Sequence, residues 1–177
     1  MYNYYERISR DYDVLTRRLI ERGIRISTME SATAGLIASL ITDTEGASAI
    51  YRGSYVTYCN ETKIKCGVPV DVITEKGVYS LETAEAMAIT CRREFLANIG
   101  VGISGTMGNI DPENEDSVPG QIFFAIDYDG KVKSFTIGMG EKEYNAPYEL
   151  YRAFFLQFKN EIDGGDNSVW TSDKKNE

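Results

Sequence analysis

Residues 24–38 read Ile-Arg-Ile-Ser-Thr-Met-Glu-Ser-Ala-Thr-Ala-Gly-Leu-Ile-Ala. The stretch begins with alternating apolar and polar residues, which are typical of a strand, and ends in small residues and an apolar run that favours a helix. A strand, a tight turn and a helix are therefore expected in succession. Ser31 falls on the turn, beside the free N–H groups of the helix N-terminus. Its hydroxyl could be a nucleophile next to an oxyanion site, or Ser31 and Thr33 could simply cap the helix.

The rest of the chain alternates helix-like and strand-like segments. Apolar stripes at helical spacing lie in residues 4–22, 36–41, 80–95 and 148–162. Runs of β-branched and aromatic residues lie in residues 50–58, 99–104, 121–128 and 131–137. Asp129-Gly130, between the last two runs, is a strong hairpin signal. This order predicts an α/β fold, a three-layer α/β/α sandwich with a mixed sheet.

Smaller features complete the expected organisation. Asn60 is expected to cap a short helix over residues 61–66, and residues 74–77 are expected to form a turn. We expect a single domain over residues 1–162. The polar, glycine-containing tail over residues 163–177 is typical of a disordered segment.

Composition and charge narrow the class of protein. The chain has 177 residues, 42% hydrophobic and 26% charged, as in a soluble domain with a real core. Its net charge of −8 argues against a nucleic-acid or anionic-membrane surface, but leaves room for a local basic pocket that binds one phosphate. The three cysteines form no C-x-x-C pair, which disfavours a disulfide framework and a structural zinc site. No transmembrane-length run and no signal peptide are visible, so we expect a cytoplasmic protein.

The sequence contains no histidine, which restricts the chemistry that it can perform. Ser-His-Asp and Cys-His catalysis and His-ligated metal sites are all excluded. A base for acyl transfer must then be Lys, Tyr, Asp or Glu. Tyr58 ends a predicted strand and Lys63 follows five positions later on a helix, so both could face one pocket with Ser31. Lys63 could act as a base only if its pKa were lowered, and an ordinary surface lysine is the alternative.

A second loop with small residues follows the strand that begins at Ile99. Gly100, Gly102 and Gly105 match G-x-G-x-x-G, but two of these glycines lie inside the strand and no long helix follows, which disfavours a dinucleotide site. The loop over residues 104–108 could bring its N–H groups to an anion, or could be an ordinary tight loop. The acidic run after it, residues 111–116, lacks calcium-loop spacing and is predicted to be a solvated surface loop.

Four segments together resemble the CinA C-terminal domain family, which includes nicotinamide mononucleotide amidohydrolases of the PncC type. Residues 30–36, Glu-Ser-Ala-Thr-Ala-Gly-Leu, resemble the family motif E-S-[CA]-T-[GA]-G-L. Residues 53–63 are similar to G-x-[VI]-[VT]-x-Y-[SC]-N-x-x-K, and residues 104–108 to [TS]-G-[IT]-[AM]-G. Residues 119–122 resemble a shortened P-V-G-T-V, and the similarity as a whole spans residues 23–158. The family's serine, tyrosine and lysine fall on Ser31, Tyr58 and Lys63.

The resemblance implies an amidohydrolase that deamidates nicotinamide mononucleotide to nicotinate mononucleotide and ammonia. Ser31 would attack the carboxamide, and Lys63, helped by Tyr58, would move the proton. A small-molecule nucleotide is the expected partner, with no cofactor and no metal, and a homo-oligomer is expected. The residues expected to hold the oxyanion or the substrate lie in three places along the chain: Thr33, Ala34, Gly35, Ser104, Gly105, Thr106 and Lys142.

Two other functions are kept as alternatives. The first is a catalytically degenerate nucleotide-binding or regulatory module with the same fold. It is favoured by Lys142 and Asn145, which stand where the family has arginines able to bind a phosphate with two parallel hydrogen bonds. The second is a purely structural role in an assembly.

Overall fold

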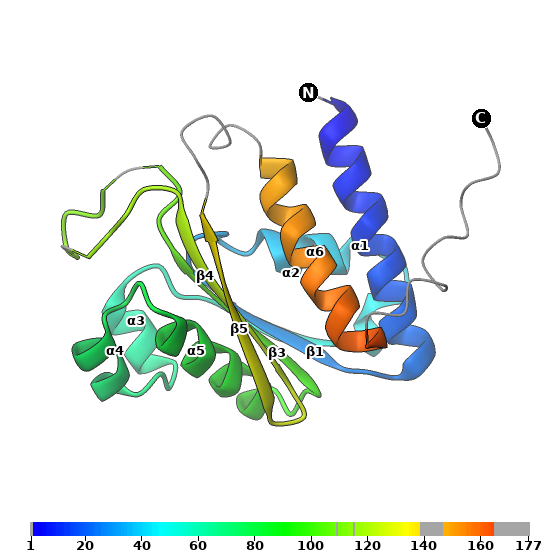
Figure 1. The fold of residues 1–177 in the computed structure, drawn as a ribbon. Coiled ribbons are helices and arrows are strands. Elements are labelled where there is room, and N and C mark those ends of the chain that lie inside the picture. Colours follow the sequence, from blue (N-terminus) through cyan, green and yellow to red (C-terminus); the bar gives the residue numbers. More distant parts are fainter. Residues whose placement is uncertain (1, 109, 115, 139–146, 165–177) are drawn as a thin grey trace.

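The computed structural model describes residues 2–108, 110–114, 116–138 and 147–164 (Figure 1). Its helices are α1 (Tyr2–Arg22), α2 (Leu36–Thr42), α3 (Asn60–Lys65), α4 (Val70–Lys76), α5 (Leu81–Glu94) and α6 (Pro147–Asp163), with one 3₁₀ turn, η1 (Ala47–Ala49). Its strands are β1 (Ile26–Glu30), β2 (Tyr51–Val56), β3 (Ile99–Gly105), β4 (Gln121–Tyr128) and β5 (Lys131–Gly138).

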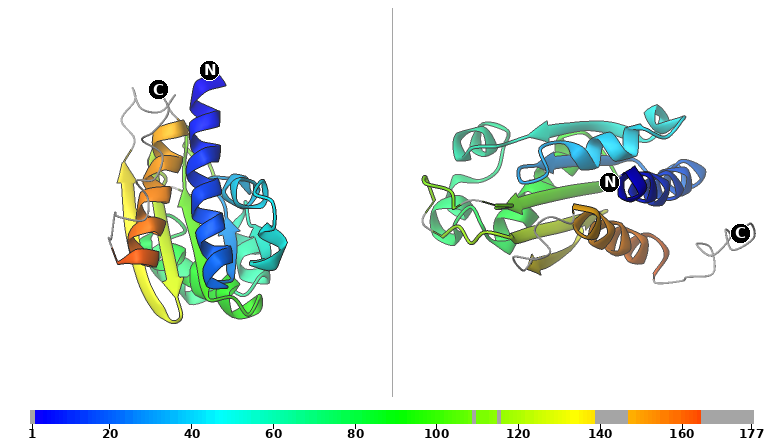
Figure 2. Two further views of the ribbon diagram at one scale, coloured as in Figure 1. Left: turned by 90° about the vertical axis from the view of Figure 1, so that its right-hand side faces the viewer. Right: turned by 90° about the horizontal axis from the view of Figure 1, so that it is seen from above.

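The predicted three-layer α/β/α sandwich is confirmed. The strands form one sheet in the order β2-β1-β3-β4-β5, in which β1 is parallel to β2 and β3, while β4 and β5 add antiparallel pairs. Helices α1, α2 and α6 cover one face of the sheet, and α3, α4 and α5 cover the other (Figures 1 and 2). All five residues of β1 are buried, as expected for a central strand of a sheet covered on both faces.

Two apolar layers hold this sandwich together. On the α1 and α6 side, Phe124 of β4 lies in an aromatic cluster, with its ring centroid 4.7 Å from that of Phe154 and 5.5 Å from that of Phe158. On the α5 side, Met29 of β1 packs with Met87 and Cys91. Rings and aliphatic side chains thus fill both interlayer spaces and fix the position of β1, which leads into Ser31.

The glycines of β3 have a packing role. A Cβ atom placed on Gly100 would lie 2.1 Å from the Ala88 carbonyl oxygen, and one placed on Gly102 would lie 2.0 Å from the Ala84 carbonyl oxygen. Only glycine lets α5 lie this close to the strand. The G-x-G pattern therefore reports helix–sheet packing and not a dinucleotide site, as the position of the glycines inside the strand indicated.

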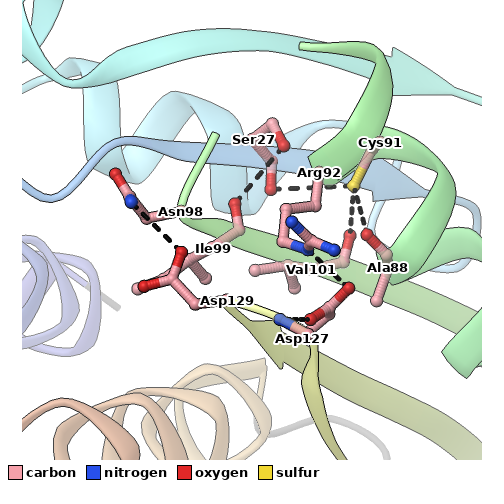
Figure 3. Close-up of polar contacts among 10 residues, drawn as sticks. Ser27, Ala88, Cys91, Arg92, Asn98, Ile99, Val101, Asp127 and Asp129 are labelled. Atoms are coloured by element: carbon pink, nitrogen blue, oxygen red, sulfur yellow. Dashed lines mark hydrogen bonds and ion pairs between the residues drawn. The ribbon is translucent and has the colours of Figure 1, made fainter. Parts of the chain in front are cut away.

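The predicted hairpin between β4 and β5 is also confirmed. Asp129 and Gly130 both have positive φ angles, of 48° and 88°, as a two-residue turn of type I′ requires. Figure 3 shows how α5 is tied to this turn. The buried Asp127 carboxylate accepts from Arg92 Nε at 2.6 Å and from the Gly130 N–H at 2.8 Å. The Asp127 carboxylate thus joins Arg92 of α5 to the Gly130 turn, and this charge-assisted hydrogen bond holds the turn against the helix that packs on β3.

Several local expectations need correction. The predicted turn over residues 74–77 is the end of α4, a seven-residue helix too short to show a periodic pattern. Cys59, and not Asn60, is the N-cap residue of α3. The predicted tail begins too early, because Asp163 ends α6 and pairs with Arg22 Nη1 at 2.8 Å. Residues 165–177 of that tail lie outside the described residues. No helix in the described ranges is both long and apolar enough to cross a membrane.

Candidate active site

A cavity of about 760 Å³ opens where three parallel strands end. Ser31 reaches it from the end of β1, Tyr58 and Lys63 from the segment after β2, and Gly105 and Asp111 from the end of β3 and the loop that follows it. Figure 1 shows this loop beside α3. Ser31, Tyr58 and Gly105 thus meet at one cavity because each lies at or just after the end of a parallel strand.

Ser31 and Lys63 meet at the floor of this cavity. The Ser31 N–H donates to the Ile103 carbonyl at 3.0 Å, which ties the serine to the neighbouring strand β3. Lys63 Nζ donates to Ser31 Oγ at 3.2 Å and to the Thr57 carbonyl at 2.9 Å. Only 1% of the Lys63 surface is exposed, so the alternative of an ordinary surface lysine is wrong.

Burial changes the acid–base behaviour of Lys63. Desolvation lowers the pKa of its ammonium to about 8, although electrostatic interactions with Cys59, Asp111 and Glu61 oppose the shift. No salt bridge to Lys63 occurs within the described residues. A neutral amine is therefore accessible near neutral pH, directly beside a serine hydroxyl.

Glu30 holds the turn that presents Ser31. Its fully buried carboxylate accepts hydrogen bonds from five donors, and the turn after β1 is folded around it. Thr33 Oγ1 donates to it at 2.6 Å and Thr28 Oγ1 at 3.0 Å, together with the N–H groups of Gly35, Ile37 and Ala38. The carboxylate thus satisfies the free N–H groups at the start of α2. Gly35 occupies the N-cap position, and its N–H is one of those bonded to Glu30. Neither Ser31 nor Thr33 therefore caps the helix, and the Ser31 hydroxyl instead accepts from Lys63 Nζ.

Several residues expected to bind the substrate have structural hydrogen bonds instead. The Ala34 N–H donates to the Ser31 carbonyl at 3.1 Å, and the Gly35 N–H to Glu30 at 3.0 Å. Ser104 Oγ donates to the Val78 carbonyl at 2.7 Å and is fully buried. In Thr106 both the hydroxyl and the N–H donate to neighbouring carbonyls, those of Val118 and Gln121. These N–H groups and hydroxyls are used in holding the cavity wall. Lys142 lies outside the described residues.

Tyr58 lies at the mouth of the cavity, with 79% of its surface exposed. Its hydroxyl makes no hydrogen bond to Ser31 or to Lys63 in the described part of the chain; the carbonyl of the preceding residue, Thr57, is what Lys63 binds. This geometry favours a contact with a bound ligand over a share in proton transfer.

The acidic loop after β3 is partly a wall of the site and not only a solvated surface. Asp111 lines the cavity and accepts from Tyr79 Oη at 2.5 Å and from Asn114 Nδ2 at 2.6 Å. Asn60 Nδ2, on α3, donates to Asn114 Oδ1 at 2.9 Å. The hydrogen bonds that Asp111 accepts, first that from Tyr79 and then that from Asn114, hold the pKa of its carboxyl below the ordinary value.

Sequence reasoning missed Glu30 and Asp111 as site residues. A carboxylate placed between a strand and a helix start was a signal for the first, because helix N-termini attract anions. Asp111 carried no such signal, since its partners come from distant parts of the chain.

Among the described residues no group of three or more Cys, Asp or Glu side chains is placed to hold a metal ion.

Comparison with known proteins gives the same fold and identifies its family. The family model of the CinA C-terminal domain matches residues 11–149. A competence-damage inducible protein of Halothermothrix orenii is 35% identical to this chain over 157 residues. The matched part covers 83% of this chain and 38% of that protein. A protein of Moorella thermoacetica with the same name is 36% identical over 148 residues, which are 78% of this chain and 36% of that protein. The chain thus spans less than two-fifths of the length of these relatives.

Solved structures agree with this assignment. A competence/damage inducible protein of Agrobacterium tumefaciens superposes with a TM-score of 0.71 and 28% identity, over 84% of this chain and 96% of its own. A CinA superfamily protein of Enterobacter cloacae shares the fold, with a TM-score of 0.79 and 21% identity, over 88% of this chain and 92% of its own. The sequence motifs, the family match and the shared fold lead to one conclusion: the chain belongs to the CinA C-terminal domain family.

Proposed function

We propose that the chain is an amidohydrolase in which Ser31 is the nucleophile and Lys63 the general base. The observation that carries the proposal is the buried Lys63 Nζ, 3.2 Å from Ser31 Oγ, with a pKa lowered to about 8. A serine beside a neutral amine has the two groups that acyl transfer needs, and a chain without histidine has to supply the base in this way.

The reaction proceeds in two steps. Neutral Lys63 takes the Ser31 hydroxyl proton while Oγ bonds to the carboxamide carbon, and the resulting ammonium then returns the proton to the leaving nitrogen. Ammonia departs and the acyl group remains on Ser31. Water then attacks this ester and loses a proton to Lys63. The Lys63 ammonium gives that proton to Ser31 Oγ as the bond between Oγ and the acyl carbon breaks, which releases the carboxylic acid and the free serine. Lys63 is neutral again at the end, so the cycle closes without a cofactor.

The oxyanion of each step needs donors that are not already used. The N–H groups of Ala32 and Thr33 meet this condition, because neither donates to an acceptor within the described residues, and Ala32 lines the cavity. We therefore assign the oxyanion site to these two amides. Thr33 was among the donors expected from the sequence, whereas the N–H groups of Ala34 and Thr106, also expected, bond to carbonyls.

The substrate proposed is a pyridine nucleotide carboxamide, nicotinamide mononucleotide, on the strength of the family. Tyr58, at the cavity mouth, and Gly105, in its wall, would contact it. Lys142 as a ligand of the phosphate, a homo-oligomeric assembly and a cytoplasmic location stay predictions.

A binding or regulatory module is the second candidate. The observation that favours it is the charge of the cavity, since Asp111 and Glu113 line it while Lys63, its one described cation, is fixed on Ser31 and Thr57. An anionic nucleotide would gain little from such a lining. Turnover decides between the two candidates.

The deciding experiment measures ammonia release from nicotinamide mononucleotide. We expect Ser31→Ala to lower kcat at least about 10³-fold while the melting temperature stays close to that of the wild type. Ser39→Ala, an exposed serine on α2, is the matched control and should retain the wild-type rate. Wild-type turnover that survives in Ser31→Ala would rule out the nucleophile. A wild type that neither binds nor hydrolyses nicotinamide mononucleotide would favour a module with another ligand.

A further inference from the structure

The cavity holds one carboxylate that is rigidly placed and not used by the mechanism above. Asp111 receives Tyr79 Oη and Asn114 Nδ2 on one oxygen and the Glu113 N–H, at 2.9 Å, on the other. Its own N–H donates to Ser117 Oγ at 2.9 Å. Three donors and one acceptor fix both the position and the ionised state of this side chain.

The partners of Asp111 belong to the parts of the chain that build the site. Tyr79 directly precedes the N-cap residue of α5, and Asn114 lies in the loop after β3. Asn114 in turn accepts from Asn60, the first residue of the helix that carries Lys63. The network therefore joins the carboxylate to the short helix of the base.

The titratable groups around Lys63 can be compared one by one. Cys59 and Glu61 lie beside Lys63 along its own segment of chain, and the Asp111 carboxylate faces it from the loop across the cavity. The phenols of Tyr58 and Tyr79 and the carboxylate of Glu113 line the same cavity. Glu61 is exposed, and its effect is therefore screened by water, whereas Asp111 is half-buried.

We propose that Asp111 is a positioning residue for the Ser31–Lys63 pair, whose carboxylate, held by Tyr79 and Asn114, sets the pH range in which Lys63 can accept the serine proton. The proposal rests on the proposed function. A negative charge across the cavity stabilises the ammonium that forms on Lys63 during each proton transfer. It also favours the protonated resting state, so the same charge makes Lys63 a stronger base and moves its working range to higher pH.

The first test is the pH profile of kcat/KM on nicotinamide mononucleotide. In Asp111→Asn the acidic midpoint should move to lower pH by about half a unit to one unit, and the plateau rate should fall, because the base is weaker. Asp111→Glu keeps the charge and should stay nearer to the wild-type midpoint. Asp116→Asn is the matched control, since it removes a charge from the same loop at an exposed residue that does not line the cavity, and its midpoint should not move.

The second test does not depend on turnover. Lysine labelled with ¹³C at Cε reports the titration of Lys63 by NMR, with the signal assigned by its loss in Lys63→Arg. The same displacement to lower pH is expected in Asp111→Asn. The proposal would be overturned if Asp111→Asn displaced the titration no further than Asp111→Glu, if Asp116→Asn displaced it equally, or if no variant displaced it. If the wild type releases no ammonia, the proposed function fails, and the NMR titration alone decides the role of Asp111.

Discussion

Replacing Lys63 by Met tests whether the amine is held neutral by burial, without any assumption about the substrate. An ordinary lysine has a pKa of 10.5, and burial lowers that of Lys63 to about 8. A change of one in pKa between the folded and unfolded states is equivalent to about 1.36 kcal/mol, so this difference corresponds to about 3 kcal/mol of unfolding free energy. The unfolded chain binds the proton up to about pH 10.5, while the folded chain releases it above about pH 8.

The sign follows from proton binding. Between these two values the unfolded state holds more protons, so Lys63 makes the wild type progressively more stable as the pH rises. Met at position 63 does not titrate. The unfolding free energy of the wild type minus that of Lys63→Met should therefore increase by about 3 kcal/mol between pH 7 and pH 10.5, whatever the Met side chain does to the packing.

Urea unfolding followed by circular dichroism at intervals across this pH range measures the difference. Lys65→Met is the matched control, because Lys65 lies exposed on the same helix, and its difference from the wild type should change little with pH. A flat difference for Lys63→Met would mean that the folded and unfolded states have the same lysine pKa. The neutral base would then lose its physical basis, and with it the proposed proton transfer.

Two further substitutions test the frame around the site. Glu30→Gln places an amide NH₂ among five donors and should lower the unfolding free energy by about 3 kcal/mol. Its control, Glu45→Gln at an exposed position beyond α2, should change that free energy by less than about 0.5 kcal/mol, and equal effects in urea titrations would contradict the role of Glu30. Gly102→Ala should lower the unfolding free energy by about 3 kcal/mol or more, because its Cβ would lie 2.0 Å from the Ala84 carbonyl oxygen. Gly138→Ala, with open space around it, should be nearly neutral, and a tolerated Gly102→Ala would show that α5 can move away from β3.

The sequence was informative where the signal is local. Alternation and apolar stripes located the strands and most helices, and Asp129-Gly130 gave the hairpin. Helix α4 was missed, because seven residues after a proline show too little periodicity to be recognised. The convergence of Ser31, Tyr58 and Gly105 could be predicted, since strand order places the ends of parallel strands at one edge.

The remaining features of the site depend on contacts between residues that are far apart in the chain. The burial of Lys63 depends on how the cavity closes over it, and a five-residue spacing from Tyr58 does not reveal that. The choice among oxyanion donors could not be made from the sequence for a related reason. A helix start offers several N–H groups, and which of them are already bonded depends on where the Glu30 carboxylate lies.

Glu30 connects the fold to the proposed chemistry. A serine at a helix start would ordinarily turn its hydroxyl back to the free N–H groups and be held there as a cap. Here Glu30 takes three of those N–H groups and the Thr33 hydroxyl, so no such bond holds Ser31. Its hydroxyl meets Lys63 instead, and the Ala32 and Thr33 amides remain unused beside it. Glu30, a buried acid that does not line the cavity, thus leaves the serine free for the proposed role of nucleophile.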